Sequence, residues 1–263
     1  MKQCNLCRGQ SILDLLDFGS HPIAHHFLSQ PGQSAYVNPV RLGFCQSCGL
    51  FQLTHPVAPD VFYTNYICLT SWKHQPHIPM IIDMIERVTG IRKNEPVLEI
   101  GCNDGIFLTA LSERGYSNLL GIEPAADAQQ AATKKGFRVL HGYFDISSAQ
   151  RIRKEFGGSR LLVIRQVLEH ISDLNGFIQA AHEAAAPDGY VLIEIPDFGF
   201  NLDILDYSLW EEHVNYFTIE TIEYFMARSG IRLLAVEPVI FSGKSLILLG
   251  QCTGQAIPDL PGY

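Results

Sequence analysis

The sequence has no apolar run close to the roughly 20 residues that a membrane-spanning helix needs. Its start, Met1-Lys2-Gln3-Cys4-Asn5, also lacks the apolar segment of a secretory signal. Basic residues are scarce, since 19 Lys and Arg stand against 27 Asp and Glu and leave a net charge of −8. Nucleic-acid-binding proteins normally carry a basic surface, so this balance argues against that class. We therefore expect a cytoplasmic protein with reduced thiols and with neither a membrane nor a nucleic acid as partner.

Charged residues of either sign are few, at 17%, whereas hydrophobic residues make up 47% of the chain. This composition can form a sizeable core and excludes wholesale disorder. The 263 residues suffice for one large domain or for a small module beside a medium one. No internal repeat and no low-complexity tract is present.

Four of the seven cysteines form two C-x2-C pairs, Cys4 with Cys7 and Cys45 with Cys48, separated by 37 residues. In a cytosolic chain such pairs indicate metal ligands before disulfides. Four cysteines form a closed tetrahedral site for Zn²⁺, and because no coordination position stays open, this zinc is expected to be structural. The alternative is two unrelated turns with buried thiols. The remaining cysteines, 68, 102 and 252, are scattered and are expected to be small buried residues.

The pattern along the chain changes after the cysteine pairs. Residues 1–55 are rich in turn signals, whereas from about Lys73 strand and helix patterns alternate, which is typical of an α/β domain with a mainly parallel sheet. Short apolar runs predict strands at 96–100, 118–122, 160–164, 190–195, 231–238 and 245–251. Amphipathic patterns predict helices at 107–114, 125–135, 148–156 and 174–186.

The most informative segment is Glu99-Ile-Gly-Cys-Asn-Asp-Gly105, where an apolar strand passes through a glycine-containing turn into a helix. Gly101 and Gly105 allow positive φ and close approach of a ligand to the backbone. The dinucleotide-binding fingerprint would need a glycine at Asn103. The E-x-G-x-x-x-G pattern instead resembles motif I of class I S-adenosylmethionine (SAM) methyltransferases.

A second acidic residue supports this resemblance. Glu123 comes 24 residues after Glu99, at the end of the next predicted strand, where open α/β sheets bind ligands. A carboxylate at this place can accept hydrogen bonds from both ribose hydroxyls. The alternative is a solvated carboxylate at a helix start.

The whole chain resembles the sugar C-methyltransferases that act on nucleotide-linked 4-keto-deoxysugars. The matching stretches are residues 4–7, 18–24, 45–53, 63–66, 99–105, 121–124, 167–174 and 194–196, and Glu212-His-Val-Asn-Tyr-Phe217. The resemblance implies a class I methyltransferase fold: a Rossmann-like, mostly parallel seven-stranded sheet with helices on both faces, preceded by a small Cys4 zinc module.

The same resemblance implies a domain division. We expect a zinc-binding module at 1–60, a linker and helix bordering the active site at 61–95, the SAM-dependent domain at 96–252 and a tail at 253–263. Family members typically continue through a further domain of roughly 150 residues, which helps to hold the nucleotide-sugar. We expect this chain to lack that domain, which leaves room for a homo-oligomer in which a second copy covers the pocket.

Residue by residue, the resemblance implies these roles. The catalytic candidates are His213 as base, Glu212 beside it and His170 as a further active-site histidine. The SAM-binding candidates are Glu99, Gly101, Asn103, Asp104, Gly105, Glu123 and Gln166. The substrate-pocket candidates are Tyr63, Tyr66, Trp210 and Tyr207. Trp210 stands where the family commonly has a tyrosine, and an indole cannot exchange a phenol's proton, so Tyr207 or another group replaces it or the reaction differs.

The chemistry expected from these parts is C-methylation. A histidine removes a proton next to a ketone of a nucleotide-activated deoxysugar or similar metabolite, and the enolate attacks the methyl group of SAM. One alternative is O- or N-methylation of another small natural-product precursor or metabolite. A second is a non-catalytic zinc-ribbon adaptor with a SAM-binding fold, against which the intact set of Glu99, Gly101, Gly105 and Glu123 argues.

Overall fold

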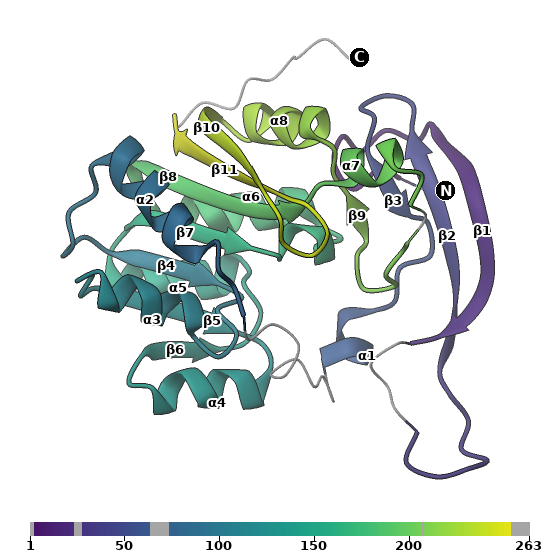
Figure 1. The fold of residues 1–263 in the computed structure, drawn as a ribbon, viewed down its shortest axis with the longest axis horizontal. Coiled ribbons are helices and arrows are strands. Elements are labelled where there is room, and N and C mark those ends of the chain that lie inside the picture. The colour runs from purple at the N-terminus through teal and green to yellow at the C-terminus, as the bar shows by residue number, and fades with distance from the viewer. Residues whose placement is uncertain (1–2, 24–27, 64–73, 207, 254–263) are drawn as a thin grey trace.

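The computed structural model describes residues 3–23, 28–63, 74–206 and 208–253, and they form two sheets (Figure 1). The larger sheet has seven strands in the order β10-β11-β8-β7-β4-β5-β6. These strands are β4 (Val97–Ile100), β5 (Leu119–Glu123), β6 (Arg138–His141), β7 (Ser159–Arg165), β8 (Ala185–Pro196), β10 (Ile231–Val239) and β11 (Ser245–Cys252). Strands β6, β5, β4, β7 and β8 are parallel, and β11 runs antiparallel to both β8 and β10. The predicted α/β class and mostly parallel seven-stranded sheet are confirmed.

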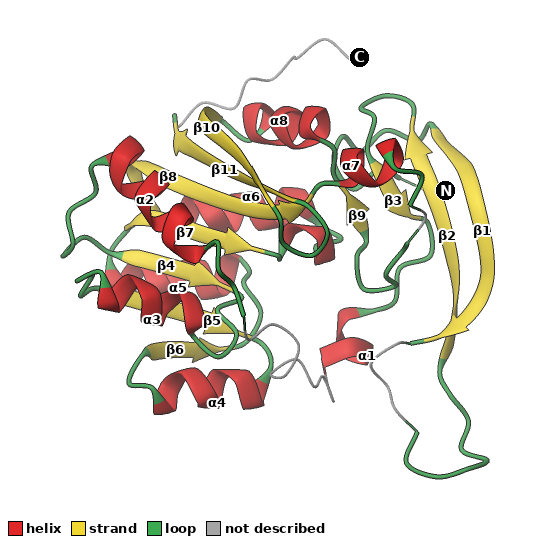
Figure 2. Cartoon of the chain, in the orientation of Figure 1, coloured by secondary structure: helices red, strands yellow, loops and turns green. Residues whose placement is uncertain are grey.

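Helices cover both faces of this sheet (Figure 2). The longer ones are α2 (Ile78–Thr89), α3 (Ile106–Glu113), α4 (Ala126–Lys134), α5 (Ile146–Phe156), α6 (Leu174–Ala184) and α8 (Ile219–Arg228). The short ones are α1 (Pro59–Tyr63), the 3-10 turn η1 (Leu168–His170) and α7 (Phe198–Asp203). No helix within the described ranges is long and apolar enough to cross a membrane.

The central strands are apolar on both sides because each side packs on a different core. In β4, Leu98 and Ile100 join a core with α5, α6 and α8, whereas Val97 faces a core with α2 and α3. This alternation follows from the two-residue period of a strand. All six predicted strands and all four predicted helices are present, with ends that differ by a few residues. In the same part of the chain, β6, β9, α7 and α8 went unpredicted.

The smaller sheet joins the N-terminal strands to a short strand from late in the chain. Its order is β1-β2-β3-β9, built from β1 (Ile12–Pro22), β2 (Val37–Cys45), β3 (Phe51–Leu53) and β9 (Asn215–Tyr216). The long β1–β2 hairpin corrects the interpretation of residues 1–55 as mainly turns; its apolar residues are punctuated by glycine and proline, which hid the strand pattern. Because Phe51 pairs with Tyr216, the N-terminal module and the Glu212–Phe217 segment share one sheet. The predicted domain division stays a prediction.

Candidate functional site

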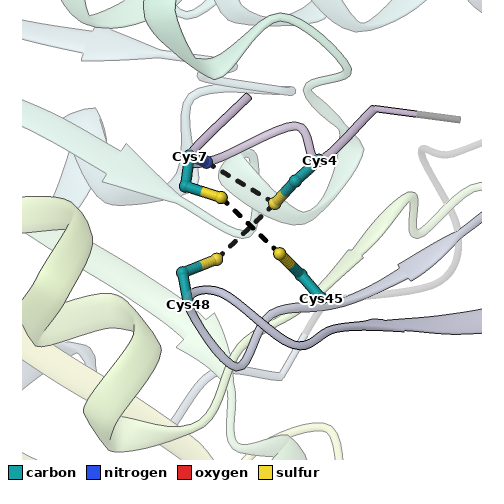
Figure 3. A group of neighbouring side chains, drawn as sticks. All are labelled: Cys4, Cys7, Cys45 and Cys48. Carbon is teal, nitrogen blue, oxygen red and sulfur yellow. Dashed lines mark hydrogen bonds between the residues drawn. The ribbon is translucent and has the colours of Figure 1, made fainter. Parts of the chain in front are cut away.

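The four paired cysteines converge at one point (Figure 3). Their sulfur atoms all lie within 4.8 Å of one another, with Cys4 3.5 Å from Cys48 and Cys7 3.5 Å from Cys45. Backbone amides support the thiols, since the Cys7 amide donates to the Cys4 sulfur at 3.5 Å. Four sulfur ligands in a closed, largely buried cluster fit a structural Zn²⁺. The four cysteines are thus positioned for a metal ion.

The other cysteines follow the expectation as far as the structure describes them. Cys102 and Cys252 are buried, at 2% and 6% exposure. Cys68 lies outside the described residues.

A cavity of about 420 Å³ opens at the carboxyl ends of β4, β5 and β7. Strand order reverses between β4 and β7, which is where open α/β sheets bind their ligands. Six of the predicted SAM-binding residues line it: Glu99, Gly101, Asn103, Asp104, Glu123 and Gln166. So do all three catalytic candidates, His170, Glu212 and His213, and the pocket candidate Trp210. Gly105 instead precedes the first residue of α3, with φ of 78°.

The loop after β4 needs glycine for two reasons. Gly101 has φ of 69°, a conformation that side-chain-bearing residues rarely adopt. A Cβ atom there would also lie 2.6 Å from Cγ2 of Val167, in the loop after β7. The backbone at Gly101 therefore packs directly against the loop after β7, and Gly101 also lines the cavity.

Glu123 holds this loop in place. Its carboxylate accepts hydrogen bonds from the backbone amides of Asn103 at 2.9 Å and Ala125 at 2.8 Å. The side chain is 7% exposed, and burial raises its pKa, opposed by these two amides. The alternative of a solvated carboxylate is therefore wrong. Contact of Glu123 with ribose hydroxyls stays a prediction. The carboxylate has further lone pairs with which it can accept these hydrogen bonds.

Glu99 presents a different electrostatic situation. It is 3% exposed, and its Oε2 has no hydrogen-bond partner among the described residues. Burial raises its pKa to about 8, and Arg165, with a guanidinium nitrogen 3.8 Å from Oε1, offsets this only in part. An unpartnered carboxyl oxygen in the wall of a cavity is suited to a cationic ligand.

A buried ion-pair network supports the floor of the cavity. Glu194 is fully buried and accepts from Nε of Arg165 at 2.6 Å, while Nε2 of His77 lies 2.9 Å from its other oxygen. Burial acts to raise the pKa of Glu194, but Arg165 and His77 outweigh it and the pKa is lowered. Gln166, with φ of 52°, contacts the same carboxylate at 3.4 Å. His77 and Glu194 are 117 residues apart in the chain, so no local sequence pattern indicates this pair.

The two candidate histidines lie side by side. The ring centroids of His170 and His213 are 4.8 Å apart, with an interplanar angle of 88°. Nδ1 of His170 lies 3.0 Å from the main-chain carbonyl oxygen of Glu212, an arrangement in which the imidazole N–H donates. Enclosure by protein lowers the pKa of both rings, and His170 lowers the pKa of His213 further. Both imidazoles are therefore neutral near pH 7.

Trp210 forms part of the cavity wall. It is 47% exposed, and its backbone N–H and C=O both hydrogen-bond to the Tyr216 hydroxyl at 2.9 Å. Tyr216 is thus buried behind the tryptophan, and burial raises its pKa above the usual range. Of the other pocket candidates, Tyr66 and Tyr207 lie outside the described residues, and Tyr63 is described only as the last residue of α1.

Comparison with known proteins agrees with this geometry. A family model described as a methyltransferase domain matches residues 71–236, and one described as a putative zinc binding domain matches residues 4–63. The chain belongs to the methyltransferase-domain family. Its N-terminal segment matches the zinc-binding family.

Individual relatives add detail. The C-methyltransferase NovU of Streptomyces niveus is 25% identical over 256 residues, which cover 94% of this chain and 60% of NovU. A ubiquinone biosynthesis O-methyltransferase of Pseudomonas aeruginosa (strain UCBPP-PA14) is 29% identical over 119 residues, covering 44% of this chain and 50% of that protein. The chain thus spans less than two thirds of the curated relatives it matches.

Solved structures share the fold. A protein from Pyrococcus horikoshii OT3 matches with a TM-score of 0.55 at 17% identity, covering 73% of this chain and 96% of that one. A SAM-dependent methyltransferase from Archaeoglobus fulgidus matches with a TM-score of 0.50 at 14% identity, covering 66% of this chain and 94% of that one.

The residues present in the methyltransferase fit SAM. The unpartnered Oε2 of Glu99 and the close backbone of Gly101 border one end of the cavity, and Glu123 borders the same space. A cationic ligand with a ribose meets acceptors at both places.

Sequence reasoning missed two groups at this site. Glu169, in η1, lines the cavity with a fully enclosed carboxyl group, and Asn215 donates to the carbonyls of Leu168 and Ile171 that flank η1. Both residues lie within stretches that resemble the sugar C-methyltransferases, but nothing local in the sequence marks their roles.

Proposed function

We propose that this methyltransferase acts in the cytoplasm and transfers the methyl group of SAM to a carbon next to a ketone, in a nucleotide-activated deoxysugar or similar small metabolite. The observation that carries the proposal is a single cavity of about 420 Å³ that brings the SAM-binding candidates and His213 together. The resemblance to a C-methyltransferase over 94% of the chain, zinc segment included, supports the C-methylation part.

The proposed catalytic base is His213. Its imidazole is neutral near pH 7, so a ring nitrogen can accept the proton from the carbon next to the ketone. His170, fixed by the Glu212 carbonyl, packs edge to face against it and limits the directions in which it can point. Glu212 also lines the cavity and is proposed to favour the protonated imidazole that forms during the reaction.

The methyl-donor end is proposed to be held by Glu99, Glu123 and the loop from Gly101 to Gly105, with Asn103, Asp104 and Gln166 alongside. When bound, SAM supplies an electrophilic methyl group. The residues of the chain align the donor with the carbon to be methylated and exclude water, which lowers the barrier by positioning. Zn²⁺ at the four cysteines takes no part in this step, since its four ligands leave no open position.

Trp210 is proposed to shape the substrate side of the cavity. Its indole is in the wall and has no exchangeable phenol proton, so it serves for packing against the substrate rather than for proton transfer. Tyr63, Tyr66 and Tyr207 remain proposed pocket residues. A second copy of the chain is a further proposed partner, and size-exclusion chromatography with light scattering tests it.

The test uses purified protein in deuterated water with a panel of nucleotide 4-keto-deoxysugars. Without SAM, deuterium should enter the carbon next to the ketone, and with SAM the product should gain a methyl group in mass spectrometry. His213→Ala should abolish both while leaving SAM affinity nearly unchanged, and His141→Ala, an exposed histidine near the same sheet edge, serves as control. Full exchange in His213→Ala would refute the base assignment.

O-methylation is the second candidate, because ubiquinone biosynthesis O-methyltransferases match over 44% of the chain. It predicts methyl transfer without deuterium exchange at carbon. The non-catalytic adaptor predicts neither turnover nor SAM binding, so a micromolar dissociation constant for SAM would exclude it.

A further inference from the structure

Glu169 is a buried acid without a hydrogen-bond partner in the described part of the chain. The residue is 1% exposed, and neither carboxyl oxygen is hydrogen-bonded to another described residue. Leaving such a group unpaired costs several kcal/mol as a carboxylate, so proteins almost always supply a partner, a proton or an ion. The mechanism proposed above makes no use of this group.

Nitrogen ligands lie next to this carboxyl. One oxygen of Glu169 and one ring nitrogen from each of His170 and His213 all lie within 4.8 Å of one another. All three residues line the cavity that holds the SAM-binding candidates. Two imidazoles and one carboxylate around one point form a ligand set for a first-row transition metal.

The hydrogen bond of His170 prepares it for such a role. Because Nδ1–H donates to the Glu212 carbonyl at 3.0 Å, the lone pair of the neutral ring is on Nε2. A metal-binding histidine typically donates its other N–H to a carbonyl or carboxylate in this way. Enclosure keeps both rings neutral, and the neutral ring is the form that binds metals.

We propose that Glu169, His170 and His213 form a binding site for a divalent transition-metal ion, separate from the cysteine cluster. Ligand atoms about 2.0–2.2 Å from an ion are at most about 4.4 Å apart. The widest separation in the cluster is no more than 4.8 Å, so small side-chain rotations close the site. Three protein ligands leave coordination positions open toward the cavity.

Metal binding at this site competes with the base, a consequence that rests on the function proposed above. The His213 lone pair that binds the ion is not available to accept a proton from carbon. The metal-loaded protein is therefore a resting form, and removal of the ion restores enolisation.

Binding is tested first, without any substrate. Protein that holds one zinc per chain is titrated with Co²⁺, and bound cobalt and retained zinc are measured by elemental analysis after gel filtration. Wild type should bind one cobalt per chain while keeping its zinc. The absorption spectrum of the bound Co²⁺ should show nitrogen and oxygen ligands and lack the thiolate band of a cysteine site. Glu169→Gln, which is close in shape, should weaken cobalt binding at least about tenfold. Glu113→Gln, an exposed acid at the end of α3, should bind as wild type does.

The proposal is overturned if wild type takes up no cobalt beyond exchange at the cysteines, or if Glu169→Gln binds it equally well. Should Glu169→Gln fold poorly, the cobalt spectrum and stoichiometry of wild type still decide. In the deuterium-exchange assay, saturating Co²⁺ should slow exchange by wild type at least tenfold. The exchange rate of Glu169→Gln, compared with its own rate without metal, should fall far less. Unchanged exchange at saturation would overturn the competition. Failure of the proposed function appears separately, as no exchange by metal-free wild type.

Discussion

Replacing Asn215 with alanine should loosen η1, the turn that carries Glu169 and His170. Asn215 is 1% exposed, and its amide donates to the Leu168 carbonyl at 3.0 Å and to the Ile171 carbonyl at 2.7 Å. Its Oδ1 accepts from Asn5 at 2.9 Å, between the first two zinc cysteines. One side chain therefore connects the zinc knuckle to the active-site turn.

The loss of stability expected for Asn215→Ala follows from the polar groups that the substitution leaves without a hydrogen bond. The Leu168 carbonyl keeps its hydrogen bond from the Ile171 amide, whereas the Ile171 carbonyl loses the one that Asn215 donates. With about 1–3 kcal/mol for a buried group without a partner and about 1 kcal/mol for an ordinary bond, Asn215→Ala should lower the free energy of unfolding by about 2–4 kcal/mol. Asn5→Ala removes one bond of the set and should cost about 1 kcal/mol.

Urea unfolding measures both variants, and Asn118→Ala serves as control because its side chain makes one weak, exposed contact at 3.5 Å. We expect the control to stay within about 0.5 kcal/mol of wild type. Asn5→Ala should also lower kcat more than it weakens SAM binding, since the perturbed turn carries His170. Equal urea midpoints for Asn215→Ala and Asn118→Ala would refute the reasoning.

Three further outcomes are expected. SAM affinity should rise by up to about tenfold per pH unit as pH increases toward 8 and then level off, because burial raises the pKa of Glu99 to about 8 and its ionised form attracts the cation. Calorimetric titration of SAM at several pH values checks this. The same pH dependence in Glu99→Gln would contradict it. Gly101→Ala should destabilise the fold and weaken SAM binding, since a Cβ atom would lie 2.6 Å from Val167 and φ is 69°. Gly115 has φ of 89° and open space around it, so thermal unfolding of Gly115→Ala measures the cost of the backbone conformation without a steric clash. Cys4→Ser should release one zinc per chain in native mass spectrometry and lower Tm, and retention of the zinc would argue against the four-cysteine site.

Patterns between residues close in the sequence sufficed to predict the cysteine cluster and most of the central sheet. The two C-x2-C pairs, the apolar runs of the central strands and the glycine spacing after Glu99 depend on residues a few positions apart, so they could be recognised directly and the structure contains them. The resemblance to a family, rather than local sequence, assigned both His170 and His213 to the active site, and the structure shows that their rings lie side by side.

Tertiary structure alone decided how the buried polar groups are paired. Glu123 accepts hydrogen bonds from the loop after β4, and His77 pairs with Glu194 although 117 residues separate them. Asn215 hydrogen-bonds both to Asn5, between the first two cysteines, and to η1. Nothing in the sequence distinguishes Glu169 from other acidic residues. Only the packing of distant segments encloses its carboxyl group and leaves it without a hydrogen-bond partner among the described residues. The physical reason is that the cost of burying a charge depends on which distant groups surround it, and chain order does not state those distances.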